Sequence, residues 1–95
     1  MEAKKIIKDG RFTFLGIKEY LICHDPYYVD YLKFDTGEYE AYDSTFDIDV
    51  FADSKAELKE KVQDAVISCW KAYVEDKTQK DDAIVKELHR IFEKV

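Results

Sequence analysis

The hydrophobic period of the chain changes at Asp53-Ser54, and this change constrains the fold more than any other feature. Before it, residues 46–52 alternate apolar and polar side chains with the period of two typical of a half-buried β-strand. After it, apolar residues recur at helical spacing: Leu58, Val62, Ala65, Val66, Cys69, Trp70 and Tyr73. Ser54 and Glu57 have the spacing of a capping box, which predicts that a helix begins there. The sequence therefore predicts a strand that leads directly into a helix.

Further strand patterns precede this junction and are separated by turn signals. The predicted turns are Asp9-Gly10, Asp25-Pro26, Asp35-Thr36-Gly37-Glu38 and Asp43-Ser44-Thr45. The predicted strands cover residues 5–8, 11–15, 18–24, 27–34, 38–43 and 46–52. Residues 27–34 are largely apolar on both faces, which predicts a central strand covered on both sides. In residues 46–52, the alternation places Asp47 and Asp49 together on the outer face.

The second half of the chain predicts two helices, over residues 55–75 and 81–94. Asp81 or Asp82 suits the start of the second helix, because an acid there interacts favourably with the helix dipole. The apolar stripe of this helix is Ile84, Leu88, Ile91 and Val95. We therefore expect a single α+β domain over residues 1–95. It has an antiparallel β-sheet of about 4–5 strands over residues 5–52, followed by two helices, the first packed on the sheet.

The charge distribution predicts the kind of partner. The chain of 95 residues has a formal net charge of -6, and residues 34–53 carry seven acids with no Lys or Arg among them. An acidic surface repels phosphates, which disfavours direct nucleic-acid binding, and it attracts a basic protein. Plain solubility is the alternative interpretation of the same acids.

Several classes of protein are disfavoured by what the sequence lacks. No apolar run approaches the roughly 18 residues of a membrane span, and no secretory signal follows the basic N-terminus. Cys23 and Cys69 show neither metal-ligand nor redox-motif spacing. We expect them to be free thiols in a reducing cytosol, which makes the predicted location cytoplasmic.

No pattern of residues indicates a catalytic site. Asp43, Asp47 and Asp49 are the strongest carboxylate cluster, and as ligands of a hard cation they would suit a divalent-metal hydrolase. A solvated outer face explains the same acids more simply. His24 beside Asp25 has no nucleophile placed with it by a local motif. The tyrosines of residues 27–42 could stack on bases, yet their neighbours are acids rather than the basic groove that such binding needs. We therefore expect no enzyme activity, no metal and no cofactor.

The strand patterns that run into residues 46–58 resemble the HicB-like family. Ser54 and Glu57 match the helix cap of that family, and Leu58, Val62 and Val66 match its sheet-facing helix positions. The resemblance covers roughly residues 20–73. It implies an antitoxin that binds and blocks a small basic RNase. The usual Gly before the helix cap is absent, and residues 81–95 form too short a tail for the family's DNA-binding unit, so the resemblance does not extend to promoter binding.

The leading hypothesis is a non-enzymatic, HicB-like protein-binding module, in which a basic partner contacts Tyr39, Asp43, Asp47 and Asp49. A second hypothesis is an acidic inhibitor of a nucleic-acid enzyme from a phage or mobile element. The divalent-metal hydrolase is the third. A homodimer that pairs an edge strand such as residues 11–15 is compatible with all three.

Overall fold

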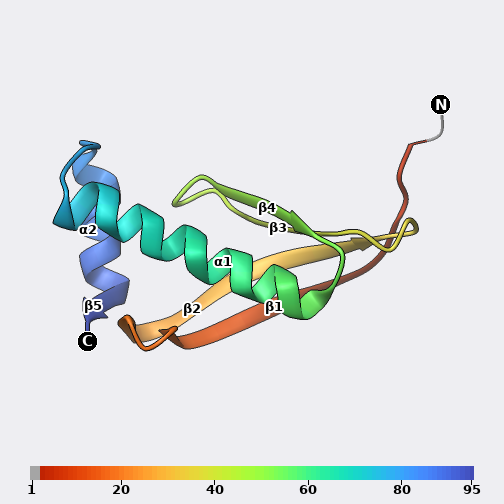
Figure 1. The fold of residues 1–95 in the computed structure, drawn as a ribbon, viewed down its shortest axis with the longest axis horizontal. Helices are drawn as coiled ribbons and strands as arrows, with labels where there is room; N and C mark the ends of the chain where they lie inside the picture. The colour runs from red at the N-terminus through yellow and green to blue at the C-terminus, as the bar shows by residue number, and fades with distance from the viewer. Residues whose placement is uncertain (1–2) are drawn as a thin grey trace.

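Four strands of the sheet follow one another along the chain and pair in that order (Figure 1). The computed structural model describes residues 3–95. Its strands β1 (Ile6–Ile17), β2 (Leu21–Phe34), β3 (Tyr39–Asp43) and β4 (Ile48–Ala52) pair antiparallel in the order β1-β2-β3-β4. Gly37, with a φ of 91°, lies in the predicted turn between β2 and β3. Because this turn fixes their register, Tyr31 lies opposite Ala41.

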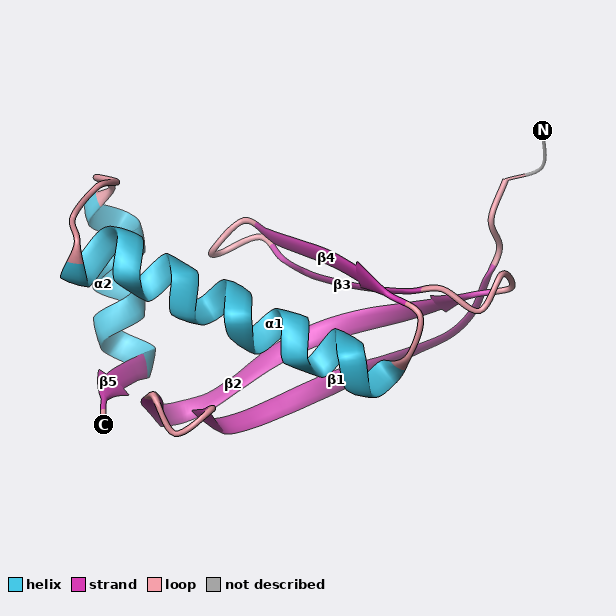
Figure 2. Cartoon of the chain, viewed as in Figure 1, coloured by secondary structure: helices cyan, strands magenta, loops and turns pink. Residues whose placement is uncertain are grey.

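Two helices follow the sheet, which confirms the predicted α+β fold. The helix α1 (Lys55–Trp70) continues into a π-helical turn, η1 (Lys71–Glu75), and α2 (Asp82–Ile91) leads into a short strand, β5 (Phe92–Lys94). Figure 2 shows α1 lying across one face of the sheet, with α2 at one end of the molecule. No helix within residues 3–95 combines the length and the apolar character needed to cross a membrane.

The start of α1 follows from the predicted cap. Ser54 is extended, and its hydroxyl accepts a hydrogen bond from the backbone N–H of Glu57. The Glu57 carboxylate pairs with Lys61, four residues further along. The buried stripe of α1 is Leu58, Val62, Val66 and Trp70. Burying each such aliphatic side chain stabilises the fold by roughly 1.5–3 kcal/mol, which fixes the helix on the sheet.

The covered face of the sheet is aromatic, and the opposite face has no helix on it. The strand residues buried beneath the helices are Phe12, Phe14, Tyr27, Val29, Tyr31, Ala41, Ile48 and Ala52. On the other face of β2, Tyr28 is 52% exposed, and Asp30, Leu32 and Phe34 are half-buried. β2 is central, as predicted, but the prediction that both of its faces are covered is wrong.

The predicted turn at Asp9-Gly10 is also wrong, because β1 runs through both residues. Gly10 lies opposite Tyr31 on β2. A Cβ atom on Gly10 would come within 2.7 Å of Cε2 in the Tyr31 ring. The aromatic ring therefore occupies the space that a side chain would take, and this glycine serves strand packing rather than a turn.

The hairpin between β1 and β2 instead turns at Lys18 and Glu19, inside a segment predicted to be strand. Both residues have positive φ, 46° and 57°, as in the type I′ turns that fit the twist of a hairpin. Lys18 is held by the first helix: its Nζ lies 2.6 Å from Glu60 and 2.7 Å from Asp64. Because Gly is absent from this turn, dipeptide preferences do not reveal it.

The predicted turn at Asp25-Pro26 is wrong because β2 continues through it as a bulge. The register of β1 against β2 shifts between Phe14 and Gly16, so that residues 23–26 of β2 lie opposite Leu15 alone. Pro26 cannot donate a backbone hydrogen bond, and a bulge is one of the few places in a sheet where none is needed.

Two other boundaries differ from the prediction. Phe46 and Asp47 belong to the turn before β4, where Asp47 has a φ of 53°, so Asp47 and Asp49 do not share the face of one strand. The second helix begins at Asp82 with Asp81 as its N-cap, within the predicted start at Asp81 or Asp82, but it ends at Ile91 rather than running to residue 94. Phe92 is extended and buried, and Val95 is exposed instead of completing the apolar stripe of the helix.

The C-terminal strand is held to the start of β2 by backbone and aromatic contacts. Phe92 pairs with Cys23, and its ring lies edge-on to Tyr27 with centroids 5.1 Å apart. In η1, the Asp76 N–H donates to the Lys71 carbonyl at 2.7 Å, the i to i+5 bond of a π-helix. The Tyr20 hydroxyl donates to Glu75 and ties this turn to the β1–β2 hairpin.

Candidate interaction surface

One face of the sheet has no helix of residues 3–95 packed on it (Figure 2), and we call it the open face. It consists of alternate residues of four strands: Asp9, Arg11, Thr13, Leu15, Tyr28, Asp30, Leu32, Phe34, Glu40, Tyr42, Asp49 and Phe51. Three aromatic side chains project from it, with Tyr28 52% exposed, Tyr42 45% and Phe51 42%. Exposed aromatic residues on a rigid sheet are typical of protein-binding surfaces.

The strand register arranges this face in rows of alternating character. One row runs from Arg11 on β1 through Asp30 and Tyr42 to Asp49 on β4. The next row runs from Asp9 through Leu32 and Glu40 to Phe51. Tyr42 thus lies between two carboxylates and Phe51 lies beside one, because cross-strand neighbours are about 5 Å apart, whereas Tyr28 lies opposite Thr13.

Carboxylates outnumber cations on the open face. Its four acids are Asp9, Asp30, Glu40 and Asp49, and the only cation projecting from its strands is Arg11. The Nε of Arg11 lies 2.7 Å from Asp30, and its guanidinium carbon lies 5.5 Å from the centroid of the Tyr28 ring. Lys4 adds a second cation at the margin, over Phe34 and Phe51, where it also pairs with Glu38.

A depression of about 360 Å³ lies on this face beside β1. It is lined by Asp9, Gly10, Arg11, Asp30, Tyr31, Leu32 and Tyr42. Its walls combine the carboxylates of Asp9 and Asp30 with the side chains of Tyr42 and Leu32. Such a hollow can accept a long basic side chain, because the aliphatic part of Lys or Arg packs on apolar groups while the charge reaches a carboxylate.

Glu40 and Asp49 are diagonal neighbours on β3 and β4. A hydrogen bond to Asp49, partial burial and the Asp49 charge together raise the pKa of Glu40 to about 7. Near neutral pH the Glu40 carboxyl is therefore protonated in part of the population. A cation placed beside it would favour its ionised form.

The four residues predicted to bind a partner are not brought together. Asp49 lies on the open face, while Asp47 is exposed in the turn before β4. Tyr39 and Asp43 project on the helix-covered side, where they pair with Ala52 and Ile48. The alternation of residues 38–43 places Glu40 and Tyr42 on the face opposite to Tyr39. That pattern indicates Tyr42, rather than Tyr39, as the neighbour of Asp49.

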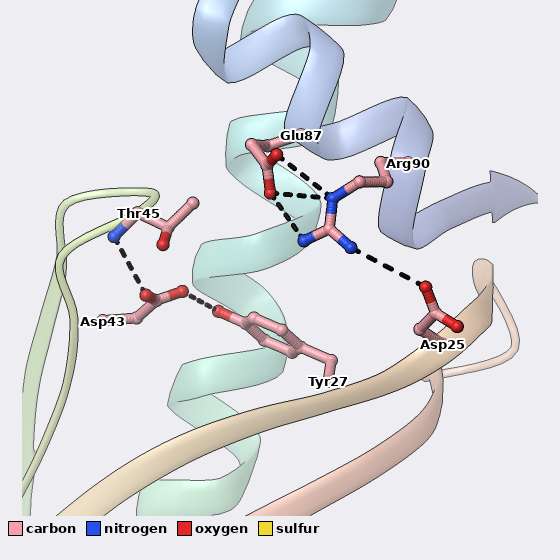
Figure 3. A network of polar contacts seen from close by, with 6 residues as sticks. All are labelled: Asp25, Tyr27, Asp43, Thr45, Glu87 and Arg90. Carbon is pink, nitrogen blue, oxygen red and sulfur yellow. Dashed lines mark hydrogen bonds and ion pairs between the residues drawn. The ribbon is translucent and has the colours of Figure 1, made fainter.

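Asp43 belongs to a separate polar network, shown in Figure 3. It accepts hydrogen bonds from the Tyr27 hydroxyl and from the Thr45 backbone N–H, the latter at 3.0 Å. Burial, followed by the hydrogen bond to the Asp43 carboxylate, raises the pKa of Tyr27 far above its usual value. Asp43 thus holds the β3–β4 turn against β2, which is a structural role.

The same network contains an ion pair across a cleft of about 190 Å³. Arg90 Nη2 lies 2.7 Å from Glu87 on the same helix, and its Nη1 lies 3.7 Å from Asp25 at the bulge of β2. These contacts tie α2 to the sheet. The charged groups of the cleft are thus engaged within the chain.

The carboxylates do not gather into a metal site within residues 3–95. There, no group of three or more His, Cys, Asp or Glu side chains is arranged to hold a metal ion. Asp43, Asp47 and Asp49, which the sequence grouped as ligands, lie respectively on the covered side, in a turn and on the open face.

Comparison with known proteins identifies no relative. No protein-family model, no curated protein and no solved structure matches this chain. The function is therefore inferred from the geometry of the chain's own surfaces.

Proposed function

We propose that this chain is a non-catalytic protein-binding module that holds a basic protein partner on the open face of its sheet. The observation that carries the proposal is the alternation of exposed aromatic residues with carboxylates across four strands. Tyr28, Tyr42 and Phe51 supply contact area, and the acids beside them supply attraction for cations. A HicB-like antitoxin, whose partner is a small basic RNase, is the specific form of the proposal that the resemblance favours.

Glu40 gives this binding a characteristic dependence on pH. Because the pKa of Glu40 is raised to about 7, a cation that binds beside it displaces its proton. Affinity for a basic partner should therefore rise as the pH increases through about 7. Salt should weaken the same interaction, since the charges lie at the surface.

An affinity capture from the native host tests the proposal. The immobilised chain should retain a basic protein at low salt and release it at high salt. The double variant Tyr42→Ser/Asp49→Lys should lose it. Asp76→Lys is the matched control, because Asp76 is exposed at the end of η1, away from the open face, and its replacement changes the charge in the same way.

The affinity of the purified partner should then be measured at about pH 6 and about pH 8, on either side of the raised pKa of Glu40. Stronger binding at the higher pH, with the dependence lost in Glu40→Gln, supports the open face as the site. Retention of the same partner by Tyr42→Ser/Asp49→Lys, or capture that salt does not weaken, would contradict the proposal.

A further inference from the structure

The outer edge of β1 has no partner strand within residues 3–95. β1 is 12 residues long and pairs only with β2. Its alternate backbone N–H and C=O groups therefore point away from the sheet. A long free edge of this kind is able to pair with another extended segment.

A groove runs beside this edge on the helix-covered side. It lies between β1 and the first turns of α1, and its volume is about 490 Å³. Its lining is Arg11, Phe12, Thr13, Lys55, Ala56 and Lys59. Phe12 and Ala56 give it an apolar floor, while the two lysines stand at its rim.

The lysines at this rim have no carboxylate partner in the described part of the chain. Lys55 Nζ lies 5.3 Å from the centroid of the Tyr31 ring, and Lys59 Nζ lies 6.0 Å from that of Phe14. Neither forms an ion pair within residues 3–95, and neither does Lys8 on the same side of β1. The rim is therefore basic, in contrast to the acidic open face.

We propose that the edge of β1 and this groove bind an acidic peptide segment that adds to the sheet as a strand. Backbone hydrogen bonds to β1 would hold the segment extended. Its helix-side residues would alternate with residues over the open face, so an apolar side chain could rest on Phe12 and a neighbouring acid could reach Lys55 or Lys59. The positive charges of Lys55 and Lys59 favour an acidic segment as the occupant of the groove.

A second copy of this chain fits the edge less well. If two β1 strands paired around a two-fold axis near Phe12, each copy would bring Lys55 and Lys59 toward the same residues of the other. Like charges that meet at an interface are unfavourable, and no acid of β1 lies on the helix side to compensate. Self-pairing is accordingly the competing outcome of the test.

The test uses a fluorescein-labelled peptide of roughly eight residues, a common strand length, in which Thr alternates with Glu or Val. Fluorescence anisotropy should show saturable binding to the full chain, and replacing each Glu of the peptide by Lys should abolish it. Amide chemical shifts should change along β1 and in the first turn of α1, with β3 and β4 unaffected.

Charge reversal at the rim gives the decisive comparison. Lys55→Glu/Lys59→Glu should weaken peptide binding by roughly tenfold or more. Lys80→Glu/Lys86→Glu is the matched control, with the same change of net charge at exposed positions distant from β1, and it should bind within roughly twofold of the unchanged chain. Circular dichroism establishes that both variants are folded.

Four results would overturn the proposal. They are no binding of the Glu peptide, equal binding of the Lys peptide, undiminished binding by Lys55→Glu/Lys59→Glu, or shift changes confined to β3 and β4. Sedimentation that shows the unchanged chain to be a dimer with its β1 amides protected would assign the edge to a second copy instead. None of these outcomes depends on the basic partner of the open face, because the peptide is acidic and the variants change Lys55 and Lys59 on α1, which lies on the other side of the sheet.

Discussion

Tyr27 and Tyr28 are adjacent in β2, yet they belong to different surfaces. Tyr27 is 5% exposed, packs against Phe46 and Phe92, and donates its hydroxyl to Asp43. Tyr28 is 52% exposed, and the Arg11 guanidinium carbon lies 5.5 Å from the centroid of its ring. One residue type therefore stabilises the fold on one face and is available to a partner on the other.

The difference arises from the two-residue period of a strand, because successive side chains point to opposite faces. The covered face is apolar and closely packed under α1, whereas the open face mixes rings with charges. Substitutions on the covered face should therefore change the free energy of unfolding. Substitutions on the open face should change binding and leave stability nearly unaltered.

The largest effect should come from a cavity beneath α1. Leu58 is fully buried, so Leu58→Ala should lower the free energy of unfolding by about 2–5 kcal/mol. Leu15, 71% exposed on the open side of β1, is the matched control, and Leu15→Ala should lower it by about 0.5 kcal/mol or less. Urea denaturation followed by circular dichroism measures both. Equal losses in the free energy of unfolding would contradict the view that only the covered face stabilises the fold.

A smaller loss should follow from filling the space at Gly10. In Gly10→Val the new side chain would meet the Tyr31 ring, which is buried, and displacing that ring should lower the free energy of unfolding by about 2–3 kcal/mol. The loss should shrink in a Tyr31→Leu background, and a double-mutant cycle measures this coupling. If the two changes were additive, the ring would not be what requires glycine.

Tyr27→Phe should have a moderate effect that depends on pH. Removing the hydroxyl that Asp43 accepts should lower the free energy of unfolding near neutral pH by about 1–2 kcal/mol. Since the pKa of Tyr27 is raised in the fold, its contribution is fully present below the unfolded value of about 10 and decreases as the pH rises above it.

Denaturation series from neutral to alkaline pH should therefore show a shallower alkaline loss of stability in Tyr27→Phe than in the unchanged chain. Tyr28→Phe, at the neighbouring exposed position, is the control and should leave the curve unchanged. An identical alkaline loss in all three proteins would refute the burial argument for Tyr27.

The smallest effect is expected at Glu40. Its pKa is raised to about 7, so its contribution to stability is present below the unfolded value of about 4.3 and is lost as the pH rises through 7. Glu40→Gln keeps a hydrogen-bond donor without a titrating charge. The change in the free energy of unfolding caused by Glu40→Gln should be more favourable at about pH 8 than at about pH 5, by less than about 1 kcal/mol. No difference between the two pH values would contradict the raised pKa of Glu40.

The helical half of the chain was predictable because its determinants are local. Ser54 and Asp81 are caps whose side chains bond to N–H groups within the next three residues. The spacing of Leu58, Val62 and Val66 then identifies the buried stripe. The change to a π-helical turn after Trp70 has no such local cause, since Tyr20 and Glu75 meet only in the folded chain.

The strand half was less predictable because turn preferences compete with cross-strand packing. Asp9-Gly10 has the composition of a hairpin turn, yet Tyr31 fills the position and the strand continues. Lys18 and Glu19 turn instead, held by carboxylates of α1 that are distant in sequence. Asp25-Pro26 forms a bulge because β2 changes its partners there.

The candidate surface was predictable in character but not in position. The excess of acids with tyrosines nearby is visible in residues 34–53, and the alternation assigns Glu40 and Tyr42 to one face. The face that remains free of helices depends on how α1 docks. The docking of α1 depends in turn on the packing of the whole aromatic core. Tyr39 and Asp43 were therefore grouped with Asp49 although they project to the opposite side.

The pairing of β5 with β2 has a consequence for the order of folding. Strands β1 to β4 meet their partners across short turns, so their contacts form after closing small loops. Cys23 and Phe92 come together only when almost the whole described chain has been brought into place. Contacts between residues so distant in sequence are intrinsically slow to form. We therefore expect this ladder to be completed after the folding transition state, so that weakening it accelerates unfolding while the folding rate stays nearly constant.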